Sequence, residues 1–320
     1  MSEVEEKQHA AENAENTEAS KTDNNNDKSE LTNVESFHNP MEVQNLNDIP
    51  SSLRLWNLLA ALFQFGQCAA LFYLSSQADT NWYLYTNFPG NLEERNLDSN
   101  VDGGDPSEEF GRPDPDEIAA YSITWYSAVF LALSGIDHLV VILPGFNSLY
   151  NYCIARHQNP FRWTEYALSA SLMRAMIAQL SGITDIHLLF TIFMLSAVTM
   201  VLGACHESVN AKARADGDRK QNWFPFLAAW IPHLASWAVI LCYFFRNVSK
   251  ADPPNFVWAI IFILFFLDGI FALLFYLQWG KIGWFESYVT GEKGFIVLSF
   301  TAKALLAWIN YVSEKYLCLQ

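Results

Sequence analysis

The chain has 320 residues, of which 51% are hydrophobic, and a formal net charge of −15. Residues 1–50 contain twelve acidic and three basic side chains, a net charge of −9, and few large apolar ones. Such a segment cannot bury enough apolar surface to offset chain entropy, so we predict a disordered acidic arm. Its polar start does not fit a cleavable signal peptide, and we expect the first apolar helix to target the chain. The five cysteines are widely spaced, which excludes a disulfide framework or a zinc site, and no metal is expected.

Seven apolar runs follow the arm, each close to the 20 or so residues that cross a bilayer. They are 53–76, 118–143, 161–182, 185–206, 223–246, 255–279 and 291–313. A soluble all-helical protein is the alternative, but the run from Phe256 to Leu277 contains a single acidic residue. We therefore predict an all-α membrane protein, with a seven-transmembrane helix bundle over 51–316 and a short outer tail at 317–320.

The Lys and Arg residues beside these runs predict an orientation, because cytoplasmic loops carry more of them. The side that receives the arm has nine: Arg54, Arg156, Arg162, Lys212, Arg214, Arg219, Lys220, Lys281 and Lys293. The other side has five: Arg95, Arg112, Arg246, Lys250 and Lys315. The amino terminus is thus predicted to be cytoplasmic. The long outer connection, 77–117, is expected to form an irregular or hairpin cap. A glycosylation sequon begins at Asn247 on this outer side.

Lys303 is the clearest functional candidate, because ionisable residues at mid-membrane are costly. It lies roughly 18 Å along its helix from Gly291 at 1.5 Å per residue, too deep to reach either surface easily. Two roles remain open for the residue alone: an ion pair with a buried carboxylate, or a covalent imine.

Glu165 in the third run is the candidate partner, since the same arithmetic brings its carboxylate to the level of the Lys303 amine. A carboxylate there would stabilise a protonated imine, but a plain ion pair needs the same geometry. Ser299 lies one turn before Lys303 on the same face. Its hydroxyl is expected to bind either the imine region or its own helix backbone.

Other buried polar residues are less specific. His138 in the second run and Gln64 and Gln67 in the first are predicted to line an inner polar cavity, although membrane histidines often serve only as hydrogen-bonding residues. Asp137, Asp268 and Arg174 are candidates for a proton path. Arg174 lies nine residues after Glu165, half a turn around the helix, and is not expected to share the Lys303 site.

Three segments resemble one known family. Asn159–Met173 resembles the third helix of the heliorhodopsins, and Ile177–Asp185 resembles its continuation into the fourth. Gly291–Trp308 is similar to the helix that bears retinal in that family. Weaker similarity extends over about 53–313, without the arm and much of the outer loop.

The resemblance implies all-trans retinal as a Schiff base on Lys303, with Glu165 as counterion and Ser299 near the imine. It also implies a cytoplasmic amino terminus, which the charge distribution predicts independently. Family members typically form homodimers in the lipid membrane and act as slowly cycling light sensors. A cytoplasmic signalling partner is therefore expected, with no enzymatic activity and no nucleic-acid partner.

The sequence also departs from related patterns. The family often has a histidine opposite the one matched by His138, and Gln64 is expected at that position here. Asp137, Asp268 and Arg174 stand where uncharged residues are usual. Ordinary microbial pumps carry an Asp four residues before the retinal lysine, and Ser299 at that position argues against an outward proton pump. The Asp-Arg-Tyr and Asn-Pro-x-x-Tyr signatures of animal receptors are missing.

Three functions follow as hypotheses. The first is a sensory photoreceptor whose bundle changes shape after light. The second is a light-gated or light-driven proton or ion conductance through Asp268, Asp137 or Arg174. The third is a retinal or lipid binder without photoactivity, or a small-molecule transporter.

Overall fold

The structure is a computed structural model that describes residues 51–76, 82–87, 115–217, 220–250 and 255–317. The predicted acidic arm, most of the 77–117 connection and residues 318–320 lie outside this part. The described residues belong to one compact unit by their backbone contacts.

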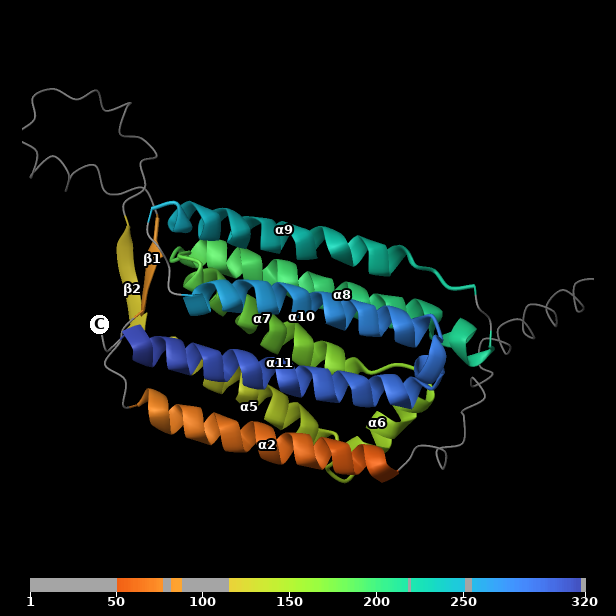
Figure 1. Cartoon of the computed structure of the whole chain (residues 1–320). Coiled ribbons are helices and arrows are strands. Elements are labelled where there is room, and N and C mark those ends of the chain that lie inside the picture. Colours follow the sequence, from red (N-terminus) through yellow and green to blue (C-terminus); the bar gives the residue numbers. More distant parts are fainter. Residues whose placement is uncertain (1–50, 77–81, 88–114, 218–219, 251–254, 318–320) are drawn as a thin grey trace, which may run out of the picture. The chain divides into compact units, whose positions relative to one another are not determined.

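Seven long helices run side by side and make up most of the described unit (Figure 1). They are α2 (Ser51–Ser75), α5 (Thr124–Val140), α7 (Pro160–Leu180), α8 (Ile186–Ala215), α9 (Phe224–Val248), α10 (Asn255–Trp279) and α11 (Tyr288–Leu317). A short helix, α6 (Phe146–Ala155), and a 3₁₀ turn, η2 (Gly283–Glu286), join neighbouring helices.

Local sequence signals set the helix starts. The Asn159 side chain accepts a hydrogen bond from the Arg162 amide, and Pro160 occupies the first turn of α7, where its missing N–H costs nothing. The Asp185 side chain caps α8 in the same way by accepting from the Leu188 amide. These caps mark the residues at which α7 and α8 begin.

A two-stranded antiparallel sheet covers one end of the bundle, which we call the sheet end; the opposite end, where α6 lies, is the α6 end (Figure 1). Strand β1 (Trp82–Thr86) pairs with β2 (Asp116–Tyr121), and the Tyr85 amide donates to the Thr184 carbonyl at 3.0 Å. The sheet is the hairpin form of the predicted cap. The run 118–143 was therefore wrong as a single helix, because its first residues belong to β2 and α5 begins only at Thr124.

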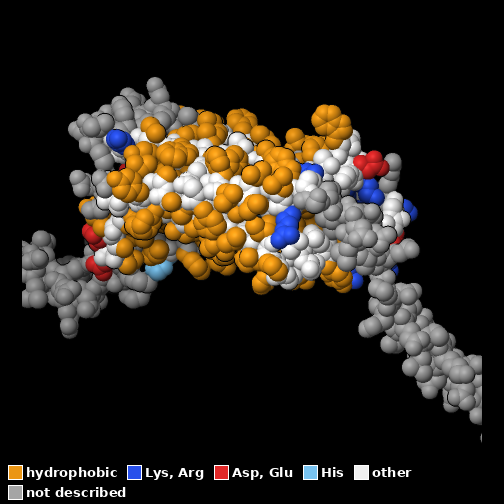
Figure 2. All heavy atoms as spheres, turned by 90° about the horizontal axis from the view of Figure 1, so that it is seen from below, with side chains coloured by type: hydrophobic (Ala, Val, Ile, Leu, Met, Phe, Trp, Pro, Cys, Tyr) orange, Lys and Arg blue, Asp and Glu red, His pale blue; other side chains and the backbone are white. Residues whose placement is uncertain are grey.

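The surface is apolar and the interior is rich in polar groups, the reverse of a soluble protein. Side chains such as Leu62, Phe190, Ile231 and Phe266 are more than 60% exposed. Hydrophobic side chains cover most of the bundle face seen in Figure 2. Such a surface is suited to lipid, so the described unit is a multi-pass integral-membrane fold.

Five described helices are long and apolar enough to cross a membrane: α2, α8, α9, α10 and α11. The other two helices of the bundle miss that standard for physical reasons. Helix α5 has only 17 residues, and α7 carries Arg162, Glu165 and Arg174. Both pack inside the bundle, with α5 against α2 and α7, and α7 against α8. Their charges and length are compatible with burial among other helices.

The hydrophobic core is divided into two clusters along the bundle axis. Along α11, Phe295 and Ile296 belong to one cluster, whereas Leu306 and Ala307 belong to the other. Lys303 lies on α11 between these two groups, and Ser134 and His138 are placed similarly on α5 between Leu131 and Val141. The packing thus leaves a polar layer in the middle of the bundle.

Candidate functional site

Lys303 is at the centre of the polar layer and is only 3% exposed. Its Nζ donates three hydrogen bonds: to Glu165 Oε1 at 2.6 Å, to Ser299 Oγ at 3.0 Å and to Ser134 Oγ at 3.1 Å. The amine also lies 5.4 Å from the centre of the Tyr166 ring. All three donors of an ammonium group are therefore satisfied, and its charge is balanced by one buried carboxylate.

Helices α5, α7 and α11 supply these groups, and the level predicted for Lys303 and Glu165 agrees with their contact. Of the two contacts expected for the Ser299 hydroxyl, the structure has the one with the Lys303 amine. Ser134 was not predicted. It lies one turn before His138 on the same face of α5, and that spacing was the available signal.

A small polar cavity adjoins the Glu165 side of the pair. Its volume is about 20 Å³, enough for roughly one water molecule. Its lining includes Asn57, Asp137, His138, Arg162, Glu165, Tyr166, Glu292 and Ser299. This cavity is the closest counterpart of the inner polar cavity expected from the sequence.

The partner of His138 is Asn57, with 2.8 Å between His138 Nδ1 and Asn57 Oδ1. Gln64, expected opposite this histidine, is fully buried but does not line the small cavity. Asn57 and Gln64 are seven residues apart and share a face of α2, about 10 Å apart along its axis. The residue expected opposite His138 was thus predicted on the correct face of α2 but at the wrong depth along it. Gln67 is further along and accepts from Trp308 Nε1 at 3.0 Å.

A larger cavity opens on the other side of Lys303 among α7, α8, α9, α10 and α11. Its lining is mainly aromatic and aliphatic, with residues such as Trp163, Tyr166, Met200, Phe226, Trp230 and Phe271. Lys303 is its only lysine among the described residues. An elongated apolar ligand with one amine-reactive end would suit this chemistry.

Arg174 and Asp268 also line the larger cavity and pair with each other at 2.5 Å. Trp237 Nε1 donates to the same carboxylate at 3.0 Å, and the guanidinium lies 4.5 Å from the Trp237 ring centre. Arg174 does not contact Lys303, as expected, but it does share a cavity with it.

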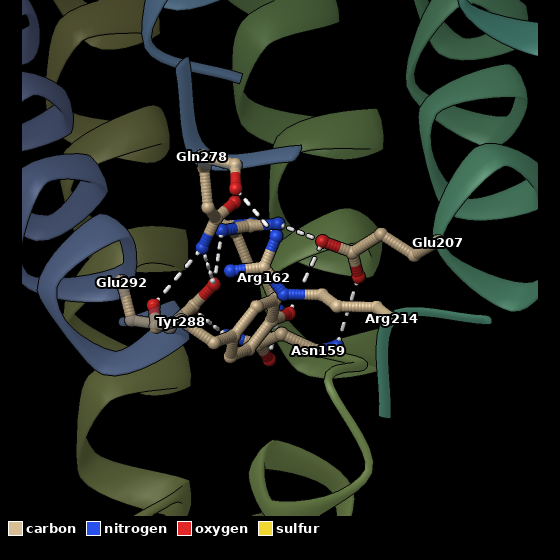
Figure 3. Close-up of polar contacts among 7 residues, drawn as sticks. All are labelled: Asn159, Arg162, Glu207, Arg214, Gln278, Tyr288 and Glu292. Carbon is tan, nitrogen blue, oxygen red and sulfur yellow. Dashed lines mark hydrogen bonds and ion pairs between the residues drawn. The ribbon is translucent and has the colours of Figure 1, made fainter. Parts of the chain in front are cut away.

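A second charged cluster lies at the α6 end around Arg162 (Figure 3). Arg162 pairs with both Glu207 of α8 and Glu292 of α11, and all three side chains are at least 94% buried. Asn159, Arg214, Gln278 and Tyr288 complete the group drawn. The sequence indicated Arg162 only as a flanking base, because the register that brings two glutamates to it is a property of the packed bundle.

The heliorhodopsin family model matches residues 53–314, more than four fifths of the chain. The chain belongs to the heliorhodopsin family. Membership makes it a retinal-binding, light-responsive membrane protein, and retinal is its cofactor. A comparison with curated proteins finds no match.

Solved microbial rhodopsins share the fold of this heliorhodopsin at low identity. A light-driven proton pump from Coccomyxa subellipsoidea is 12% identical, with a TM-score of 0.52 over 83% of this chain and 98% of that one. A light-driven proton pump from Leptosphaeria maculans is 11% identical, with a TM-score of 0.54 over 84% and 98%. The rhodopsin of Exiguobacterium sibiricum is 13% identical, with a TM-score of 0.52 over 86% and 99%. These likenesses concern the fold alone.

The residues of the larger cavity fit retinal. Its wall is mainly apolar, as a polyene requires, and the hydroxyls of Ser169 and Ser196 in the wall have no hydrogen-bond partner in the described part of the chain. At one side Lys303 supplies an amine, with Glu165 beside it. Among the described residues, no group of three or more His, Cys, Asp or Glu is placed to hold a metal ion.

The sequon asparagine has a structural role. Asn247 Nδ2, the atom that would carry a glycan, donates to the Ser181 carbonyl at 2.8 Å. It also lies against Gly182, whose φ is +93° and where an added Cβ would be 1.9 Å from that nitrogen. The amide thus holds the α7–α8 turn, and glycosylation would require this contact to break.

Proposed function

We propose that this heliorhodopsin is a sensory photoreceptor with seven membrane-spanning helices, with retinal attached to Lys303 and Glu165 as counterion. The observation that carries the proposal is the 2.6 Å contact between the buried Lys303 amine and the Glu165 carboxylate beside an apolar cavity. When bound, retinal supplies light absorption and isomerisation. The chain's residues supply the charge balance, the proton contacts and the walls that transmit the change in shape.

Attachment of retinal changes the contacts of the Lys303 nitrogen. A free ammonium has three N–H groups, which match the three observed acceptors, whereas a protonated imine has one. Glu165 is the acceptor expected to keep that hydrogen bond, because it balances the charge in a site of low dielectric constant. Ser299 and Ser134 are then released to bind each other, water or Glu165.

The orientation and assembly are part of the same proposal. The excess of Lys and Arg on the arm side supports a cytoplasmic amino terminus. The arm and the α8–α9 loop then face the cytoplasm, where a signalling partner would bind. A homodimer in the membrane is proposed from family membership, and we propose no enzymatic conversion.

Light-driven or light-gated proton conductance is the second candidate. Arg174 and Asp268 motivate it, but their ion pair and the Trp237 hydrogen bond give each a local partner. Asp137 lines the small cavity, away from this pair. Voltage clamp under illumination separates the candidates. Photocurrent that disappears in Asp268→Asn would exclude the purely sensory function, and absence of current at all voltages supports it.

The pigment itself is the sharpest test. Membranes that contain the full chain are given all-trans retinal, and we expect a visible absorption band that is absent in Lys303→Ala. Lys293→Ala is the matched control, since Lys293 lies on the same helix at the α6 end, and it should keep the band. A band in Lys303→Ala would disprove the attachment site. No band in the unmodified chain would favour a binder or transporter without photoactivity.

A further inference from the structure

The cluster around Arg162 has no part in the proposed function, although it lies in the same polar interior as Lys303. Glu292 Oε1 accepts from Arg162 and from Gln278 Nε2, the latter at 3.2 Å, and its Oε2 accepts from Asn159 Nδ2 at 2.6 Å. Glu207 accepts from Arg162, from the Asn159 amide and from Tyr288 Oη. Figure 3 shows both carboxylates converging on the one guanidinium.

The cluster can take up one proton. In all six hydrogen bonds that Glu207 and Glu292 make, the carboxylate oxygen is the acceptor, as expected when both groups are ionised. Of the cations in the described part of the chain, only Arg162 contacts them. The nearby Arg214 donates instead to the carbonyls of Gln278 and Glu286. A proton on one carboxyl would leave Arg162 paired with the other, so the buried charges would balance.

The small cavity joins this cluster to the Lys303 site. Glu165 and Ser299, which contact the Lys303 amine, line it together with Arg162 and Glu292. Arg162 Nε is buried and has no hydrogen-bond partner among the described residues, which leaves a donor for a water in the cavity. About one water fits the volume of 20 Å³, so a single bridging molecule would complete a hydrogen-bonded path. Glu207 does not line the cavity.

We propose that Glu292 is the acceptor of the proton that the Lys303 nitrogen loses after illumination. The N–H bond at Lys303 breaks, the proton passes along Glu165 and the cavity water, and an O–H bond forms on Glu292. Arg162 remains paired with Glu207 until the proton returns by the same path. The inference rests on the proposed function, since it requires the pigment.

Other titratable groups around the cavity are competing acceptors. They are Asp137 and His138 of α5, Tyr150 of α6, and Glu165 and Tyr166 of α7. His138 already shares a hydrogen bond with Asn57, and no ion pair with a described residue holds the Asp137 carboxylate. Glu292 differs because it shares one guanidinium with a second carboxylate: protonation relieves the repulsion between the two, and Glu207 stays on Arg162.

Light-minus-dark infrared spectroscopy of the full chain in lipid vesicles with all-trans retinal tests the proposal. We expect a carbonyl band of a newly protonated carboxylic acid that is lost in Glu292→Gln and kept in Glu314→Gln. The second variant is matched, because Glu314 is also a buried glutamate of α11 but lines neither cavity. Glu207→Gln should weaken the band, because Arg162 would then have no carboxylate partner once Glu292 is protonated. Loss of the proton from the Lys303 nitrogen should slow about a hundredfold in Glu292→Gln and stay unchanged in Glu314→Gln.

The light-induced band would overturn the proposal if it persisted in Glu292→Gln, or if Asp137→Asn removed it. If Glu292→Gln forms no pigment, glutamate labelled with ¹³C in the unmodified chain decides, because an unshifted band excludes every glutamate. Absence of any visible band in the unmodified chain contradicts the proposed function instead.

Discussion

Two ion pairs adjoin the larger cavity, one through Lys303 and the other through both Arg174 and Asp268, and they differ in their surroundings. Lys303–Glu165 lies among the hydroxyls of Ser134 and Ser299 and adjoins a polar cavity. Arg174–Asp268 lies against an indole ring. The lysine amine can form a covalent bond to a carbonyl, whereas a guanidinium stays protonated and is a poor nucleophile. A buried charge pair is therefore functional only through the chemistry of its cation and what surrounds it.

The largest effect on the visible band is expected when each cation is replaced by the other type, as in Lys303→Arg and Arg174→Lys. Lys303→Arg keeps a positive charge beside Glu165 but removes the reactive amine, so the visible band should be lost completely. Arg174→Lys keeps the charge beside Asp268 and should keep the band. Absorption spectra of membranes given all-trans retinal measure both, and a band in Lys303→Arg would contradict the covalent role.

The next prediction compares the carboxylates of Glu165 and Asp268 by the position of the visible absorption band after each is neutralised. Glu165 stabilises positive charge at the nitrogen in the ground state, so Glu165→Gln should move the band to longer wavelength. Asp268→Asn changes a charge that has its own partner and does not touch Lys303, and its shift should be smaller. The two band positions at one pH give the comparison. Equal shifts would mean that Asp268 acts on the chromophore as directly as Glu165.

The sequence predicted one pair and not the other for a geometric reason. Depth along a helix follows from residue number, so Lys303 and Glu165 were expected at one level, where they meet. Which faces of α7 and α10 oppose each other depends on packing, and the residues next to Arg174 or Asp268 in the sequence do not indicate it. For the same reason the sequence did not predict that Glu207 and Glu292 contact Arg162.

Element boundaries show a second limit. The segment Asp116–Tyr121 forms β2, but its apolar residues continue without a break into α5 and read as one helical run. Only its pairing with Trp82–Thr86, more than 30 residues earlier, makes it a strand. Helix α8 ends nine residues beyond the predicted position, because Glu207, Asn210 and Arg214 are buried among neighbours and the helix does not end with the apolar run.

We expect the Arg174–Asp268 pair to contribute to stability in a way that two apolar side chains can replace. Asp268→Leu leaves a buried guanidinium without its counter-charge and should lower the free energy of unfolding by about 3 kcal/mol. The lower end of the usual range applies, because the Asp268 side chain is 31% exposed. Arg174→Met combined with Asp268→Leu should restore most of the loss while the pigment band remains. Thermal loss of the band measures each variant, and a double variant no better than the single one would show that the pair is needed.

The last prediction concerns the pH dependence of stability, which we expect to depend on a residue outside both ion pairs. His157 lies in the α6–α7 connection, where burial, followed by the charges of Arg214 and Lys281, lowers its pKa to about 4. Its unfolded pKa is close to 6.5, so between those values the unfolded chain binds more protons than the folded chain. Stability from this residue is therefore present above pH 6.5 and decreases as the pH falls towards 4.

A matched substitution isolates that contribution. His157 has a φ of +57°, a left-handed conformation that asparagine tolerates well, so His157→Asn removes the titrating ring with little backbone strain. Thermal unfolding of the variant should depend less on pH between 6.5 and 4 than that of the unmodified chain. If the two curves are parallel, the loss of stability in acid arises elsewhere, and the carboxylates of Glu165 and Asp268 become the groups to substitute next.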